Sequence, residues 1–165
     1  LTDLLAKGEL PLRVTHNDTK LNNVLFDKET EQSICVIDLD TIMPGLSLYD
    51  FGDSIRSGAN AAKEDETDLA KIYIDLDLFA GYTDGYLSET AESLNDAEVE
   101  NLAFGAKLMT FECGIRFLTD YLQGDTYFRI HRENHNLDRC HTQFKLVADM
   151  EKKWDEMHKI NEKYC

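Results

Sequence analysis

The feature that most restricts the fold is one strand–turn–strand pattern in a chain whose later apolar residues have helical spacing. Val24-Leu25-Phe26 and Ser33 to Ile37 (SICVI) are short apolar runs, separated by the charged stretch Asp27 to Gln32. Short apolar runs bounded by turn residues are typical of strands. We therefore predict a β-hairpin, with Ser33 to Ile37 as a buried strand.

Helices are expected through most of the remaining chain. They are predicted over Leu48 to Ser57, from about Asp77 to Ala91, from Asn95 to about Leu122, and from Leu137 to Tyr164. Asn95 is a good N-cap because acidic residues follow it, whereas Pro44 and Gly45 predict a loop over Thr41 to Ser47. The predicted fold class is α+β and mostly helical, with the polar chemistry in the first third of the chain.

Composition narrows the classes of partner. The chain has 165 residues, which fits one domain, and a formal net charge of −15. A strongly acidic surface repels phosphate backbones and anionic lipids, so we expect neither a nucleic acid nor a membrane as partner. The sequence has no signal-peptide pattern and no run of 18 apolar residues, and we expect a cytoplasmic protein.

The segment before the hairpin contains a catalytic pattern. His16, Asp18 and Asn23 match H-x-D-x-x-x-x-N, the pattern of the protein-kinase catalytic loop. An aspartate in such a loop faces the acceptor hydroxyl and takes or steers its proton. The asparagine offers a neutral oxygen ligand to Mg²⁺. We therefore predict Asp18 as the catalytic base and Asn23 as a metal ligand.

A second acidic motif follows the predicted hairpin. Asp38 lies fifteen residues after Asn23, at the end of the predicted strand, where its carboxylate can join Asn23 on one Mg²⁺. Phosphoryl transfer requires positioning and charge neutralisation, which one base and two metal ligands can supply. Asp50-Phe51-Gly52 is a literal D-F-G, the metal motif of protein kinases, but it begins a predicted helix. We therefore expect Asp50 to be a capping or structural acid.

The two motifs together resemble a known superfamily. H-x-D-x-x-x-x-N, a hydrophobic strand and I-D-x-D are similar to the aminoglycoside phosphotransferase and choline kinase superfamily, which is protein-kinase-like and has two lobes. THNDTKLNNVLFD and VIDLDTIMPGLSLYDFGDSIR resemble bacterial N-acetylhexosamine 1-kinases. The similarity covers almost the whole chain and is most specific in the first sixty residues. It implies ATP and Mg²⁺ as cofactors and transfer of the γ-phosphate to the anomeric hydroxyl of an N-acetylhexosamine.

The resemblance also implies roles for individual residues. It supports Asp18 as the base, makes Asp40 a supporting acid near the metal, and makes His16 a brace for the metal-binding segment. In GIRFLTDYLQGDTYF, Arg116 and Tyr127 resemble residues that contact the sugar. These two are the candidate substrate-binding residues.

Members of this superfamily have a first lobe that carries a phosphate-binding lysine and a loop over the triphosphate. Only fifteen residues precede His16. We therefore expect residues 1–165 to be the C-terminal catalytic lobe of a longer kinase. The N-terminal nucleotide lobe is expected to be its missing partner, and the chain is expected to be inactive alone.

Two alternatives remain open. A kinase for choline, an aminoglycoside or homoserine is one of them, because the charge of −15 suits a cationic substrate. A non-catalytic binding module derived from a kinase is the other.

Overall fold

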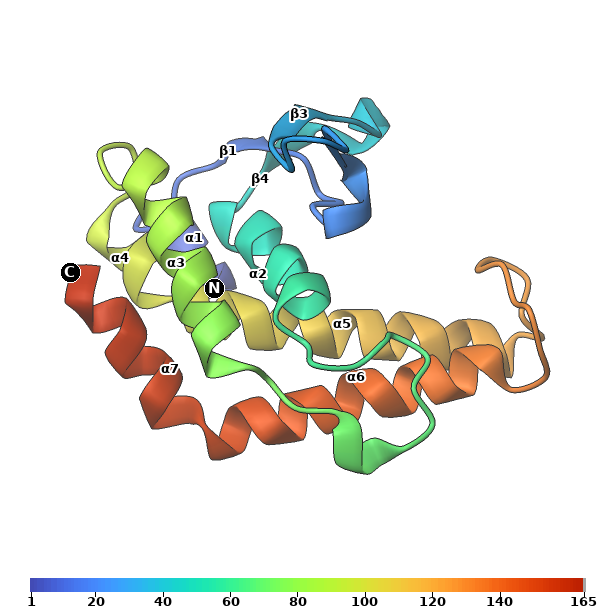
Figure 1. The fold of residues 1–165 in the computed structure, drawn as a ribbon. Coiled ribbons are helices and arrows are strands. Elements are labelled where there is room, and N and C mark those ends of the chain that lie inside the picture. The colour runs from blue at the N-terminus through green and yellow to red at the C-terminus, as the bar shows by residue number, and fades with distance from the viewer. Residues whose placement is uncertain (165) are drawn as a thin grey trace.

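The computed structural model describes residues 1–164. The chain forms eleven regular elements joined by loops and short 3₁₀ turns: α1 (Thr2–Ala6), β1 (Arg13–Thr15), β2 (Val24–Phe26), β3 (Ser33–Val36), β4 (Met43–Gly45), α2 (Ser47–Gly58), α3 (Leu76–Thr90), α4 (Asp96–Glu100), α5 (Leu102–Leu122), α6 (His135–Lys152) and α7 (Trp154–Asn161). Helices dominate and the strands are confined to the first third, so the predicted α+β class is confirmed (Figure 1).

Two antiparallel ribbons position the polar loops. The predicted hairpin is confirmed, since β2 pairs with β3, and β1 pairs with β4. Strand β4 lies where a loop was predicted, because its partner β1 is thirty residues away and no local signal reveals the pairing. The loops β1–β2 and β3–β4 each connect one ribbon to the other. They must therefore lie side by side.

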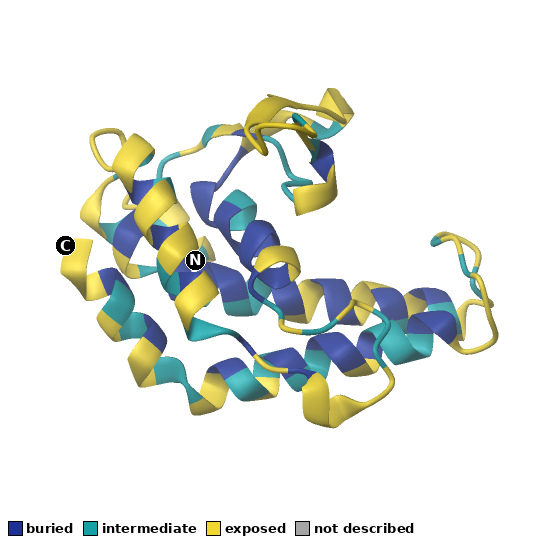
Figure 2. Ribbon diagram, in the orientation of Figure 1, coloured by how far each residue is buried: buried dark blue, intermediate teal, exposed yellow. Residues whose placement is uncertain are grey.

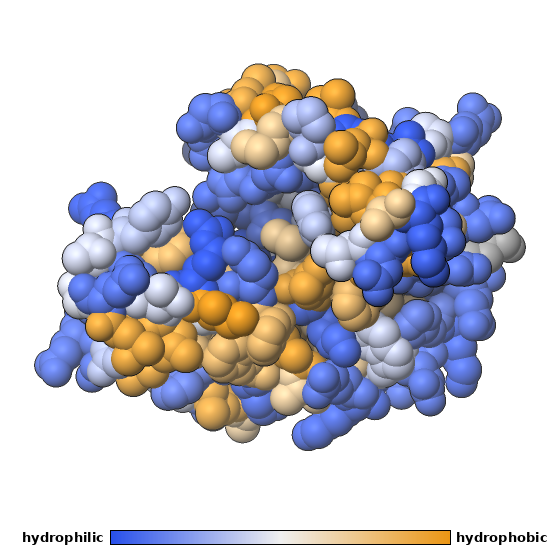
Figure 3. Space-filling model, turned by 180° about the vertical axis from the view of Figure 1, so that it is seen from behind, coloured by the Kyte–Doolittle hydropathy of each residue, from blue (hydrophilic) through white to orange (hydrophobic). Residues whose placement is uncertain are grey.

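The predicted burial of the SICVI strand is wrong. Ile34 is 64% exposed and Val36 51% exposed, and Phe26 on the facing strand is 49% exposed. The hairpin stands at the top of the molecule and is almost wholly exposed (Figure 2), with hydrophobic side chains gathered over it (Figure 3). The pattern identified the strand, but burial depends on what packs against it, and no helix among residues 1–164 covers this hairpin.

The core lies between the helices. Helices α5 and α6 run side by side along the base, and α2 crosses α5 below the ribbons (Figure 1). The α2–α5 backbones approach closely because both contact positions are glycine: a Cβ on Gly52 would overlap the carbonyl of Gly105. Phe51, beside Gly52, is fully buried and packs edge-on against Phe79 of α3.

Two of the predicted helices are divided. The helix that starts at Asn95 ends as α4 at Glu100, and α5 begins at Leu102. Asn101 lies at the break, and its side-chain Nδ2 donates to the Ala97 carbonyl, a local bond that competes with helix propagation. The predicted Leu137–Tyr164 helix begins earlier, at His135, and divides at Lys153 into α6 and α7.

Hydropathy gives one further result. Within residues 1–164, every helix is either too short or too polar to cross a bilayer.

Candidate active site

The two neighbouring loops are joined by hydrogen bonds. The backbone N–H of Ile37 donates to the Asn23 carbonyl at 2.9 Å, and Thr41 Oγ1 donates to the His16 carbonyl at 2.6 Å. His16 Nδ1 accepts from the Asp18 N–H at 3.3 Å, so Nε2 carries the ring proton and donates to the Ile37 carbonyl at 3.0 Å. His16 therefore links the loop of Asp18 to the segment that leads into Asp38.

The acid of the D-F-G tripeptide supports this loop from α2. The Asp50 carboxylate accepts the backbone N–H groups of His16 and Asn17, both at 2.7 Å. Its backbone carbonyl accepts from Thr19 Oγ1 at 2.5 Å. Asn17 has φ 62°, a left-handed conformation that asparagine adopts more readily than other non-glycine residues, and the bond to Asp50 fixes its backbone there. The prediction that Asp50 is a structural acid is confirmed.

Asp18 is held by two side-chain donors. Lys20 Nζ and Asn23 Nδ2 both lie 2.8 Å from Asp18 Oδ2, and Asn23 Nδ2 also donates to the Asp18 carbonyl at 2.8 Å. Partial burial opposes ionisation of Asp18, but the bonds from Lys20 and Asn23 lower its pKa below the ordinary value. Asn23 itself is only 5% exposed. Its nitrogen is committed to Asp18, so the amide oxygen is the atom left for a ligand.

Asp38 and Asp40 form a pair of neighbouring acids beside that loop. Asp38 has φ 65°, and both residues are exposed, so Asp38 does not point into the core. The pKa of Asp38 is raised because its protonated carboxyl can donate a hydrogen bond to the Asp40 carboxylate and because the negative charge of Asp40 opposes its ionisation; the charge of Asp18 adds to this effect. Carboxylates that repel one another in this way are stabilised by a divalent cation.

The donor set is compatible with Mg²⁺ in particular. Within residues 1–164, no group of three or more His, Cys, Asp or Glu side chains is placed to hold a metal ion. Mg²⁺ prefers oxygen ligands and usually binds one or two carboxylates, with substrate phosphates and water completing its shell. Asn23, Asp38 and Asp40 supply donor oxygens of the kind that such an open site uses.

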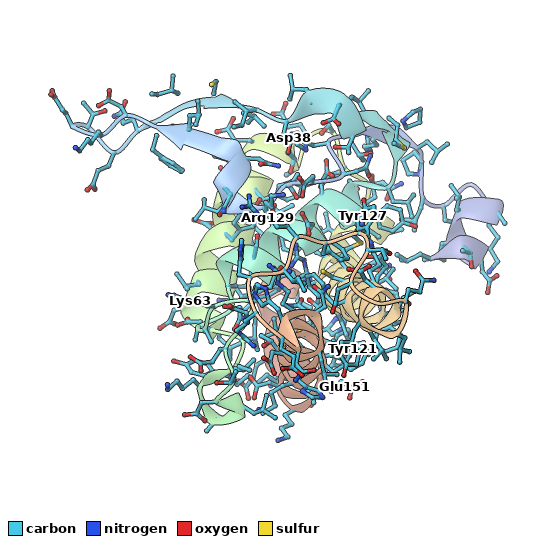
Figure 4. The ribbon with its side chains drawn as sticks, turned by 90° about the vertical axis from the view of Figure 1, so that its right-hand side faces the viewer. Asp38, Lys63, Tyr121, Tyr127, Arg129 and Glu151 are labelled. Carbon is cyan, nitrogen blue, oxygen red and sulfur yellow. The ribbon has the colours of Figure 1, made fainter. Side chains whose placement is uncertain are left out.

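A pocket of about 520 Å³ lies between these loops and the helices, and we call it the main pocket. Asp18, Arg116 and Tyr127 all line it, so residues a hundred positions apart in the sequence meet in one cavity. In Figure 4, Asp38 lies near the top of the view and Arg129 and Tyr127 lie lower. The latter two belong to the segment 123–134, which joins α5 to α6. The predicted base and the predicted substrate-binding residues therefore share one space.

The Arg116 side chain lies against the ring of Tyr127 and against that of the next residue, Phe128. The Arg116 guanidinium carbon lies 5.8 Å from the centroid of the Tyr127 ring and 5.4 Å from that of Phe128. Glu112, one turn earlier on α5, lies 3.7 Å from Arg116 Nε. Arg116 is half-exposed and is thus oriented by two rings and one acid, with the pocket in front of it.

Several basic residues of the main pocket were not predicted. They are Lys20, Arg56, Arg129 and Arg139. Lys20 could have been found, because it lies two residues after Asp18 in the catalytic motif. The three arginines come from α2, the α5–α6 segment and α6, and only the tertiary fold brings them together.

The chain was compared with sequence models of known protein families, and one family matches it. The sequence model of the phosphotransferase enzyme family (APH) matches residues 1–90, just over half of the 165-residue chain. The matched segment contains Asp18, Asn23, Asp38 and the supporting Asp50. Arg116 and the α5–α6 segment lie outside it.

Proposed function

The chain belongs to the phosphotransferase enzyme family, and from this premise we propose that it is the catalytic lobe of a kinase that transfers the γ-phosphate of ATP to an N-acetylhexosamine. The acceptor atom is the anomeric hydroxyl, and the product is a sugar 1-phosphate. One observation supports this proposal above others. Asp18, held by Lys20 and Asn23, lines the same pocket as Arg116 and Tyr127.

Asp18 orients the acceptor hydroxyl and receives its proton. The hydroxyl oxygen forms a bond to the γ-phosphorus while the bond from that phosphorus to the bridging β–γ oxygen breaks, and the proton passes to an Asp18 oxygen. The lowered pKa of Asp18 makes it a weak base. Such a base suits a loose transition state, in which the proton leaves late and alignment contributes most.

Asn23, Asp38 and Asp40 are the residues that would hold Mg²⁺. When bound, the ion neutralises charge on the phosphate oxygens and fixes their position. The chain adds cations of its own. Lys20 lies against Asp18, and among residues 1–164 Arg129 has no acidic partner within ion-pair distance although it lines the main pocket. Both are available to the transferred phosphoryl group.

The charge balance of the pocket favours a neutral sugar over a cationic substrate. The whole chain has a net charge of −15, but the main pocket is lined by five lysines and arginines and four aspartates and glutamates. A polycationic aminoglycoside or choline finds no acidic surplus there. Tyr127 is 74% exposed and offers a ring face against which the apolar side of a sugar can pack. Choline, aminoglycoside and homoserine kinases remain the second candidates, since the hydroxyl chemistry is the same.

The hairpin supports the proposal that this chain works with a second lobe. Its apolar side chains, including Ile34 and Val36, are exposed on the strand that leads into Asp38. Burying such a surface is favourable, and nucleotide pockets of this kind form between two lobes. We therefore expect an N-terminal nucleotide lobe to pack on it. A purely non-catalytic module is disfavoured because Asp18, Asn23 and Asp38 are all present.

The experiment is a kinetic comparison in the full-length protein. Asp18→Asn should lower kcat by about 10²–10⁴ with little change in ATP affinity, because the acid acts only as the transfer occurs. Asp155→Asn, on the exposed face of α7, is the matched control and should leave kcat unchanged. A near-normal kcat in Asp18→Asn would exclude this residue from the mechanism. Faster transfer to an aminoglycoside or to choline than to N-acetylhexosamines would favour the second candidates.

A further inference from the structure

The segment 123–134 between α5 and α6 has an unusual support. It supplies Tyr127, Phe128 and Arg129 to the main pocket but contains no helix or strand. The backbone N–H groups of Thr126 and Tyr127 donate to Asp120 Oδ1 at 2.9 and 2.8 Å, and that of Phe128 donates to Asp120 Oδ2 at 2.9 Å. One carboxylate thus fixes three consecutive residues of the segment.

Asp120 is itself firmly placed. It lies in the last turn of α5 and is 3% exposed, and Asn136 Nδ2 of α6 donates to its Oδ2 at 2.8 Å. Burial opposes ionisation of the carboxyl, but the three backbone donors lower the pKa of Asp120 below its ordinary value. A charged, fully hydrogen-bonded acid therefore ties α5, the segment and α6 together.

Packing supports the segment at Phe128, which lies against the buried cluster of Cys113, Phe117 and Cys140, but hardly at Tyr127, which is 74% exposed. Behind the segment lies a second hollow of about 350 Å³, lined by Asp120 and Thr119 among others. Arg116, Tyr127 and Phe128 line both this rear hollow and the main pocket. The wall that presents Tyr127 therefore has open space on both sides. At residues 126–128 its position depends on the hydrogen bonds to Asp120 and on the ring contacts of Phe128, while Asn136 and Arg139 of α6 hold the flanking residues Asp125 and Arg129.

We propose that Asp120 is a positioning residue for the acceptor substrate, acting through the backbone of residues 126–128 to set where the Tyr127 ring stands. The inference rests on the proposed function, because it assigns the wall to the acceptor side of the pocket. Asp120 touches no reacting atom. It governs acceptor binding and leaves the chemistry of Asp18 and the ATP side unchanged.

The test replaces the carboxylate by its isosteric amide. In Asp120→Asn, one of the two carboxylate oxygens becomes an NH₂ group. This group cannot accept a hydrogen bond, and it faces an N–H group that also donates, so at least one backbone bond is lost. We expect the KM for the acceptor to rise about tenfold, because a Tyr127 ring that is no longer held in place must be ordered at the expense of acceptor binding. The KM for ATP and kcat should stay within about twofold in the full-length protein. The control is Asp75→Asn, another acid that accepts two backbone N–H bonds, at the start of α3 and away from the pocket.

Two further measurements separate positioning from general stability. Amide hydrogen exchange at residues 126–128 should become faster in Asp120→Asn while the amides of α5 and α6 remain protected. In a Tyr127→Ala background, the effect of Asp120→Asn on the acceptor KM should fall to within about twofold, because residues that act as one unit are not additive. If Asp120→Asn does not fold, Asp120→Glu, which keeps the charge but shifts it, replaces it in the same assays.

The outcomes are distinct. An unchanged acceptor KM despite faster exchange at residues 126–128 overturns the inference, as does full additivity with Tyr127→Ala or an equal rise in the KM for ATP. If the wild-type protein phosphorylates none of the tested hydroxyl acceptors, the proposed function fails and the acceptor role falls with it. That failure is seen in the wild type, before any Asp120 variant is compared.

Discussion

The strand that leads into the catalytic loop is anchored by one buried ion pair, and breaking it should be costly. The Glu98 carboxylate, 1% exposed, accepts Arg13 Nε at 2.7 Å and Nη2 at 2.6 Å. It also accepts Ser47 Oγ at 2.6 Å and the backbone N–H of Asn95 at 3.0 Å. These bonds join β1 to the start of α2 and to α4.

The expected loss in Glu98→Gln follows from this geometry. Removing one partner of a buried ion pair costs about 3–5 kcal/mol because it leaves the other charge uncompensated. The Arg13 side chain is 30% exposed and can be partly rehydrated, so we expect the free energy of unfolding to fall by about 3 kcal/mol, the lower end of that range. Urea unfolding at pH 7 measures it. Asp84→Asn, which removes a surface acid that accepts one bond from Tyr164, is the control and should cost less than about 0.5 kcal/mol.

The pH dependence gives an independent check. Burial opposes ionisation of Glu98, but the bonds from Arg13, Ser47 and Asn95 lower its pKa below the unfolded value. A carboxyl with a depressed pKa stabilises the fold above its unfolded pKa of about 4.3, and this contribution is lost as the pH falls through the folded-state pKa. The difference between wild type and Glu98→Gln should therefore shrink below about pH 4. A loss below about 1 kcal/mol at pH 7, or a difference independent of pH, would show that this pair does not anchor β1.

Three further predictions concern the site. In the full-length protein, Asp50→Asn should lower kcat by about 10–100-fold, because the amide keeps only one of the two oxygens that accept the N–H groups of His16 and Asn17. An unchanged kcat would mean that this loop keeps its conformation without Asp50. Arg116→Ala should raise the acceptor KM about tenfold with the KM for ATP unchanged, and lowered thermal stability with a normal acceptor KM would assign Arg116 a structural role. The isolated 165-residue chain should fold but turn over no MgATP, and sugar 1-phosphate formed at about 1–100 s⁻¹ would contradict the need for a second lobe.

The parts of the fold that the sequence predicted are those with local signals. The hairpin, helices α2 and α3 and the Asn95 cap each follow from a short run of residues. The pairing of β4 with β1 was missed because neither strand, three residues long, has a pattern of its own. The exposure of the SICVI strand was missed for a different reason, since an apolar run predicts burial only where something covers it.

The candidate site divides in the same way. The candidates from His16 to Asp38 were identified from motif spacing and from the family resemblance, and the structure places both of their loops between the two ribbons. Arg129 and Arg139 gave no signal in the sequence. They line the main pocket from the α5–α6 segment and from α6, which only the tertiary fold brings beside Asp18. Asp120 was equally invisible, since an aspartate near a helix end is usually a surface residue.

These two halves of the pocket are held by different means, and this has a consequence for specificity. The half with Asp18 is fixed by backbone bonds between two ribbons and by Asp50, so few substitutions can move it without disrupting the fold. The half with Tyr127 is held by the Asp120 carboxylate and by the ring contacts of Phe128, and it has open space on both sides. On the proposed function, we therefore expect changes in residues 123–134 to alter which hydroxyl compound is bound while the proposed phosphoryl-transfer residues stay in place. On this physical basis, acceptor preference should be the property of this chain most easily changed by substitution.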